Sequence, residues 1–166
     1  MAYKIAIIIG SLRKDSLNRK VARSICGLRN DNLDCSMIEI GDLPLYNQDL
    51  DADPPEQWTR FRQQVAAADG VLFCSPEYNR GIPGVLKNAI DVGSRPYGQS
   101  VFDKKPGAIV TASPGAIGGF GSNHQIPRQR CFSTCRSCSS PRPISATSAT
   151  TVSTIAAALR TARSRT

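Results

Sequence analysis

The residues best suited to chemistry lie in a short loop near the amino terminus. Residues 10–18 read Gly-Ser-Leu-Arg-Lys-Asp-Ser-Leu-Asn and stand between an apolar run and an amphipathic segment. Ser11, Ser16 and Asn18 offer neutral hydrogen-bond donors, and Arg13 offers a planar fork that suits phosphate. Backbone N–H groups at the start of a helix would add to an anion site. The spacing matches neither GxGxxG nor a Walker motif, which disfavours a dinucleotide Rossmann site or an ATP P-loop. A capped turn with solvated charges is the alternative.

A second loop carries an aromatic residue between two prolines. Residues 75–81 read Ser-Pro-Glu-Tyr-Asn-Arg-Gly and follow a short apolar run. Tyr78 and the neighbouring backbone amides suit a planar heterocycle, with the ring against the tyrosine and main-chain groups at its polar edge. The alternative is a plain turn with a surface tyrosine.

A third loop, residues 113–119, is rich in small residues that allow close approach to the backbone. Alone it is a weak signal. Together the three loops describe one site, with phosphate at the first strand and a flat ring across the third and fourth. The sequence offers no Ser/His/Asp set, Cys/His set or paired carboxylates. We therefore expect a bound cofactor to supply any chemistry.

Alternating strands and helices must position these loops. Apolar runs predict strands over residues 3–9, 35–40, 70–74 and 107–111. Helical spacing predicts helices that begin near residue 16 and extend over 54–68 and 84–92, whereas 112–122 is expected to be a glycine-rich turn. This alternation predicts a doubly wound α/β domain with a parallel sheet. Ligands of such sheets bind at the carboxyl ends of the strands, which is where the three loops begin.

The net charge of +8 is unevenly distributed along the 166 residues. Residues 1–124 carry 14 basic and 13 acidic residues, whereas residues 125–166 carry 7 basic residues and no acidic ones. Because the excess belongs to one segment, we expect no nucleic-acid partner. No apolar run is long enough to span a membrane, and no signal peptide is recognisable, so we expect a cytoplasmic protein without membrane insertion.

Metal binding is also not expected. Cys131, Cys135 and Cys138 are close in sequence, but the one histidine, His124, stands seven residues before them and is near a proline. Zinc needs about four ligands. The three other cysteines are expected to be buried, reduced thiols.

The three loops resemble one known family. GSLRKDSLN, then SPEYNRGIPGVLKNAID with SRPYG, and then TASPGAIGG are similar to the motifs of the NADPH-dependent FMN reductases, over residues 3 to about 125. Within the family the chain looks most like bacterial flavin-dependent quinone, chromate and ferric reductases. The resemblance implies a flavodoxin-like fold with strand order 2-1-3-4-5 and bound FMN. Family members often carry Trp after the aspartate of NAID, whereas Val92 follows Asp91 here.

The resemblance also implies a role for each loop. The FMN phosphate would be held by Ser11, Arg13, Ser16 and Asn18. The isoalloxazine would be lined by Pro76, Glu77, Tyr78 and Asn79, and its other side would be closed by Ser113 and Gly115. No protein residue is expected to be catalytic, because NAD(P)H would pass hydride to the flavin N5 in a ping-pong cycle. The acceptor would be a small molecule: a quinone, or chromate, a ferric complex or an azo compound. The alternative is a flavodoxin-type electron carrier, although carriers tend to present an acidic face and residues 1–124 carry a net charge of only +1.

The last part of the chain departs from the family. We expect residues 1–125 to form the FMN-binding domain and residues 126–166 to be an aberrant basic tail, with the fifth strand and last helix missing or altered. Residues 131–166 contain 15 Ser and Thr among 36.

Read one base out of frame, residues 130–144 can encode Leu-Phe-Leu-Asn-Val-Pro-Val-Met-Gln-Gln-Pro-Glu-Ala-Tyr-Ile, which resembles the stretch that family members carry here. The hypothesis is a frameshift within residues 125–130. A natural basic tail is the alternative. Intact family members are expected to be homodimers or homotetramers.

Overall fold

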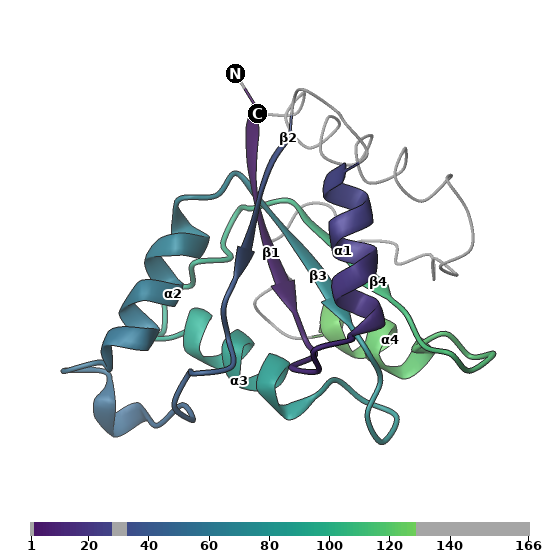
Figure 1. The fold of residues 1–166 in the computed structure, drawn as a ribbon. Coiled ribbons are helices and arrows are strands. Elements are labelled where there is room, and N and C mark those ends of the chain that lie inside the picture. Colours follow the sequence, from purple (N-terminus) through teal and green to yellow (C-terminus); the bar gives the residue numbers. More distant parts are fainter. Residues whose placement is uncertain (1, 28–32, 129–166) are drawn as a thin grey trace.

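The computed structural model describes residues 2–27 and 33–128 and contains a parallel sheet (Figure 1). Its strands are β1 (Tyr3–Ile9), β2 (Leu33–Ile38), β3 (Gly70–Ser75) and β4 (Gly107–Thr111). They lie in the order β2-β1-β3-β4, and every pairing is parallel. This order confirms the flavodoxin-like arrangement expected for the first four strands. The segment in which the fifth strand and last helix were expected to be missing or altered lies beyond Arg128, outside the described residues.

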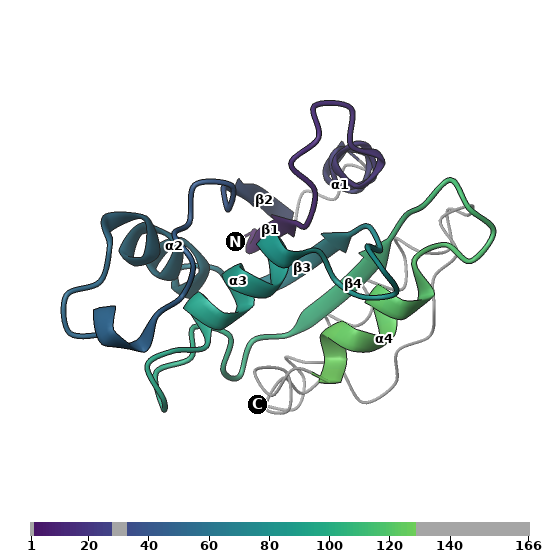
Figure 2. The same ribbon diagram turned by 90° about the horizontal axis from the view of Figure 1, so that it is seen from below.

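Helices cover both faces of the sheet. They are α1 (Leu17–Gly27), α2 (Glu56–Ala66), α3 (Gly84–Gly93) and α4 (Phe120–Arg128), and a short 3-10 helix, η1, spans Gln48–Leu50. Figure 2 shows α1 on one face and α2, α3 and α4 on the other. The described part of the chain is therefore doubly wound, as the alternation of elements predicted.

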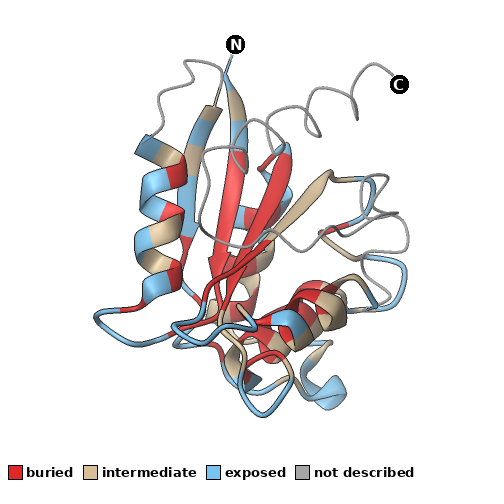
Figure 3. Cartoon of the chain, turned by 90° about the vertical axis from the view of Figure 1, so that its right-hand side faces the viewer, coloured by how far each residue is buried: buried red, intermediate tan, exposed pale blue. Residues whose placement is uncertain are grey.

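The core follows from the two-residue period of the central strands. In β1, Ile5, Ile7 and Ile9 face α1, where they pack with Ala22 and Ile25. The opposite face of the sheet packs against α2 and α3 in a larger cluster that includes Ala6, Ile8, Phe73, Trp58, Phe61 and Leu86. β3 is buried along its whole length (Figure 3). Packing on both faces of the sheet fixes the direction in which the loops after β1 and β3 leave the sheet.

Two elements differ from the sequence-based expectation. β2 begins at Leu33 rather than at residue 35 and ends at Ile38, because Leu33 pairs with Tyr3 at the start of β1. Helix α4 begins inside the segment expected to be a turn and continues through Arg128, past residue 125. Gly121, Ser122, Asn123 and Pro127 give this helix low intrinsic propensity, so packing, with Ile126 fully buried, must stabilise it.

Within residues 2–27 and 33–128, no helix has both the length and the apolar composition needed to cross a membrane.

Candidate cofactor site

The three loops singled out in the sequence all leave the carboxyl edge of the sheet. The chain passes from β1 outward to β2 and then returns across β1 to β3, so the loops after β1 and β3 flank the point where the strand order reverses. Such a point is where ligands bind in open α/β sheets. The Gly10 N–H donates to the Cys74 carbonyl (2.9 Å), and a Cβ on Gly10 would lie 2.9 Å from the Ser75 hydroxyl oxygen. The first two loops therefore begin in contact.

The first loop opens helix α1 with several hydrogen-bond donors and one acidic residue, Asp15, which is exposed. Ser11 and Ser16 are buried, whereas Arg13 is exposed. The Ser16 hydroxyl accepts a hydrogen bond from the Arg19 N–H (3.2 Å) and so caps the helix. The first turn of α1 contains no acidic residue. The positive end of the helix is thus left for an external anion, and the hydroxyls and the guanidinium are the donor types that suit a phosphate.

Asn18 joins the first loop to the third. Its side-chain amide donates to the Ala112 carbonyl (3.0 Å), and its Oδ1 accepts from the Ala112 N–H (3.0 Å). Asn18 is 2% exposed. Both polar ends of this side chain are used by the main chain that follows β4. The residue therefore holds two walls of the site together.

The second loop presents Tyr78 on a tight turn. The main chains of Tyr78 and Gly81 exchange two hydrogen bonds of 2.9 Å. Between them, Asn79 and Arg80 have φ angles of 50° and 63°, which is the conformation of a type I′ turn. Tyr78 is 49% exposed, so part of the residue is open to a ligand. Pro76, at the start of this loop, is half-buried.

The Glu77 side chain contacts both helix α4 and Arg80 of its own loop. Its Oε2 accepts a hydrogen bond from the Gly121 N–H (2.6 Å), and its Oε1 pairs with Arg80 Nη1 (3.3 Å). The side chain is only 11% exposed. What Glu77 can offer a ligand is therefore its main chain.

The third loop is shaped in part by two hydrogen bonds from side chains. The Ser113 hydroxyl accepts from the Gly115 N–H (3.2 Å), and both residues are exposed. The Thr111 hydroxyl donates to the Gly118 carbonyl (2.9 Å). Gly118 and Gly119 have φ angles of 62° and 83°, which explains the glycine pair that ends this loop. Ser113 and Gly115 thus lie on the outer part of the loop, beyond the Ala112 contact with Asn18.

The sequence analysis missed the residues of α4 that border the site. Phe120, 52% exposed, packs against His124 with ring centroids 4.2 Å apart. The Gln125 side chain accepts a hydrogen bond from the Ile82 N–H (2.8 Å). The spacing of Gly121, Ser122 and Gln125 is the one available signal, because residues three and four apart share a helix face.

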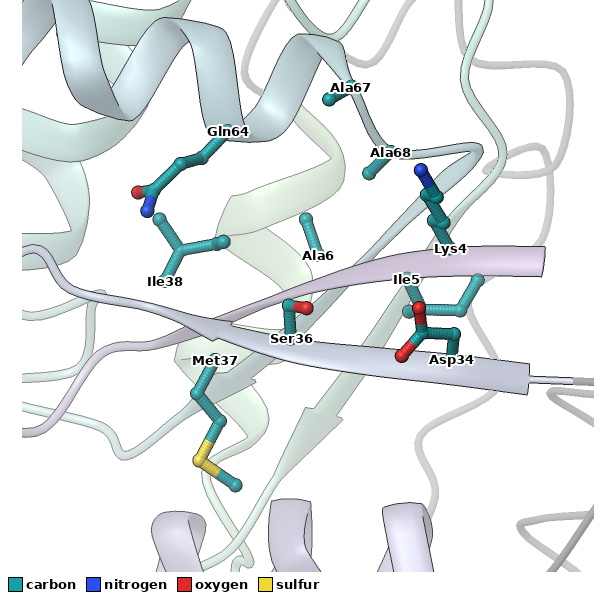
Figure 4. A pocket seen from close by; sticks show the side chains of 10 residues that line it. All are labelled: Lys4, Ile5, Ala6, Asp34, Ser36, Met37, Ile38, Gln64, Ala67 and Ala68. Atoms are coloured by element: carbon teal, nitrogen blue, oxygen red, sulfur yellow. The ribbon is translucent and has the colours of Figure 1, made fainter. Parts of the chain in front are cut away.

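A separate hollow of about 300 Å³ lies near the opposite, amino-terminal edge of the sheet, between β1, β2 and the end of α2 (Figure 4). Its polar lining comes from Lys4, Asp34, Ser36 and Gln64, all of which are exposed. Among residues 2–27 and 33–128, no three His, Cys, Asp or Glu side chains are grouped to hold a metal ion. Cys131, Cys135 and Cys138 lie outside these ranges. The three loops remain the candidate cofactor site.

The fold and the site define a flavodoxin-like α/β protein with its candidate site at the switch point of the sheet. The sequence model of one family, "NADPH-dependent FMN reductase", matches residues 3–135. A "Quinone reductase" of Pseudomonas putida is 58% identical over 131 residues, which cover 78% of this chain and 70% of the relative. The chain therefore belongs to the NADPH-dependent FMN reductase family.

Two further comparisons agree with this membership. A "2-hydroxy-1,4-benzoquinone reductase" of a Burkholderia species is 54% identical over 118 residues, which cover 71% of this chain and 64% of the relative. The solved structure of FerB, a flavoenzyme NAD(P)H:(acceptor) oxidoreductase from Paracoccus denitrificans, is similar with a TM-score of 0.82 and 33% identity. That match covers 98% of each chain.

Proposed function

We propose that the protein is an FMN-dependent NAD(P)H oxidoreductase that reduces quinones. The observation that carries the proposal is the joining of the three loops at the carboxyl edge of the sheet, above all through the paired hydrogen bonds between Asn18 and Ala112. Family membership and the quinone reductases among the relatives support the same activity. These relatives favour an enzyme over an electron carrier.

The FMN phosphate binds in this proposal at the amino end of α1. Ser11, Arg13 and Ser16 lie in the loop that opens α1, whose first turn contains no acidic residue. The donors are neutral or positive, which fits a phosphate dianion. Asn18 completes this set by fixing the third loop beside it, since its amide is bonded to Ala112.

The flavin ring lies between the second and third loops. Tyr78 offers an exposed aromatic ring, the main chains of Glu77 and Asn79 offer polar groups to the edge of the flavin ring, and Pro76 lines it. Ser113 and Gly115 close the other side. When bound, FMN supplies the redox chemistry that takes hydride from NAD(P)H and returns electrons to the acceptor. The residues of the chain bind and orient the ring and leave one face open.

Several further properties belong to the same proposal. Chromate, ferric complexes and azo compounds are additional small-molecule acceptors, and the active assembly is a homodimer or homotetramer. The reaction takes place in the cytoplasm. Residues 1–125 form the FMN-binding domain, with α4 running on to Arg128.

Steady-state kinetics test the proposal. If NAD(P)H and quinone use the same open face in turn, initial-rate plots at several quinone concentrations are parallel, and excess quinone inhibits competitively against the nicotinamide. Intersecting lines would refute the shared face. An FMN-loaded protein that does not oxidise NAD(P)H in the presence of a quinone would be a carrier instead.

A further inference from the structure

The carboxylate of Glu77 connects two loops that are far apart in sequence. Its hydrogen bond from the Gly121 N–H joins the loop after β3 to the start of α4, which follows the loop after β4. Helix α4 has no acidic residue in its own first turn. A carboxylate is stabilised at the positive end of a helix, so Glu77 supplies the charge that α4 lacks.

Two other contacts hold the same pair of elements together. The Gln125 Oε1 accepts from the Ile82 N–H (2.8 Å), at the far end of the loop. The hydroxyls of Ser75 and Ser122 share a hydrogen bond of 3.1 Å at its near end. The second loop is therefore attached to α4 before, within and after its turn.

At this junction the start of α4 is packed so closely against the second loop and the end of β4 that α4 cannot shift without a steric clash. A Cβ on Gly121 would lie 2.5 Å from the Arg80 carbonyl oxygen. On the other side of Phe120, a Cβ on Gly119 would lie 2.9 Å from the Thr111 Cβ, and Gly119 has a φ of 83°. The start of α4 is thus packed between the second loop and the end of β4. Any shift of α4 changes the separation of the two loops.

We propose that Glu77 is a positioning residue, whose carboxylate fixes the second loop against α4 and so sets the gap between the two walls that hold the flavin ring. The inference rests on the proposed function, because it needs the ring to lie between these loops. Glu77 acts through the position of Tyr78 and the third loop and does not touch the reacting atoms. Gln125 assists it from the next turn of the helix.

The affinities for FMN and riboflavin distinguish this role of Glu77 from phosphate binding by the first loop. Both FMN and riboflavin contain the ring, and only FMN contains the phosphate. Glu77→Ala is therefore expected to weaken both ligands by the same factor, tenfold or more. Glu77→Gln keeps an oxygen that can accept from the Gly121 N–H, so it is expected to stay within threefold of the parent protein. Asp42→Ala removes an exposed ion pair between the loop after β2 and helix α2, and it serves as the matched control.

The experiment titrates each variant with FMN and with riboflavin and records the fluorescence of the bound flavin. The fluorescence of the bound flavin is expected to be higher in Glu77→Ala than in the parent protein. In the variant, Tyr78 would no longer be held against the flavin ring, where it quenches the fluorescence. If Glu77→Ala does not fold, Gln125→Ala is expected to give a smaller loss with the same equal effect on both ligands. Unchanged affinity and fluorescence in folded Glu77 and Gln125 variants, or a Glu77→Gln variant as weak as Glu77→Ala, would overturn the inference. A parent protein that binds neither ligand would instead refute the proposed function.

Discussion

Asn18 and Ala112, which are 94 positions apart, exchange two hydrogen bonds of 3.0 Å in the buried centre of the candidate site. One is donated by the Asn18 amide and the other by the Ala112 N–H. The contact ties the start of α1 to the loop after β4. The contact therefore holds the first and third loops together as parts of one site.

Replacing Asn18 with Ala is expected to lower the free energy of unfolding by about 2–6 kcal/mol. The change leaves the buried N–H and carbonyl of Ala112 without partners, and each unsatisfied group costs about 1–3 kcal/mol. Urea unfolding followed by circular dichroism measures the loss. Asn47→Ala is the control, because Asn47 is exposed and only caps η1, so about 1 kcal/mol is expected. Equal small losses in the two variants would show that the Asn18 contact contributes little.

Replacing Arg13 with Ala is expected to weaken FMN binding at least tenfold and riboflavin binding little. The guanidinium is exposed beside the amino end of α1, where the proposal places the phosphate, and charge-assisted hydrogen bonds to phosphate contribute about 1.5–3 kcal/mol. Parallel titrations with the two flavins measure the difference. Equal losses for both ligands would place Arg13 away from the phosphate.

The strands that consist mainly of β-branched, apolar residues could be predicted from the sequence. The bounds of β1 (Tyr3–Ile9) and β4 (Gly107–Thr111) were predicted as observed, because short runs rich in β-branched, apolar residues beside a glycine are typical of strands. β2 was displaced by two residues, since an edge strand has weaker patterning and its register depends on pairing with β1. Helix α4 was missed, because its glycine and proline oppose a helix locally and its burial is a tertiary effect.

The loops of the site were also accessible from sequence, but their connections were not. The chemistry of residues 10–18 and 75–81 follows from residue types and from their place after strands. The partners of Asn18 and Glu77 lie 94 and 44 positions further along the chain, and no local pattern encodes such pairings. The family resemblance therefore assigned both residues to the ligand, and the structure adds that the side chain of each bonds to backbone far along the chain.

The stability of the protein is expected to fall as pH rises from about 9 towards 12, in part because of Cys74. Burial raises the pKa of the Cys74 thiol from 9.0 to about 12. Between these values the unfolded chain loses the thiol proton and the folded chain keeps it, so the unfolded state gains up to about 1.4 kcal/mol per pH unit.

The Cys74→Ala variant should therefore show a shallower decrease of unfolding free energy over this range than the parent. Denaturant titrations at several alkaline pH values compare the two slopes. Loss of the Cys74 side chain also changes the unfolding free energy by an amount that does not depend on pH, and this constant difference does not affect the slopes. Identical slopes would show that the thiol titrates alike in both states.

The frameshift hypothesis predicts that restoring the shifted frame from residues 125–130 onward adds a strand beside β4 and a closing helix. The restored chain is expected to melt at a higher temperature and to hold more FMN than the chain as written, because the added elements would cover apolar surface of the sheet. Sequencing the gene over these codons and expressing both versions provides the comparison. Equal melting temperature and equal FMN content would show that the chain as written is the native form.

The central claim is that the three joined loops form an FMN site, and titration of the purified, folded protein with FMN tests it most directly. We expect noncovalent binding of about one FMN per chain. Addition of NAD(P)H should then remove the absorbance of the oxidised flavin, and addition of a quinone should restore it. A protein that is folded by circular dichroism but takes up no FMN at micromolar concentrations would contradict the claim.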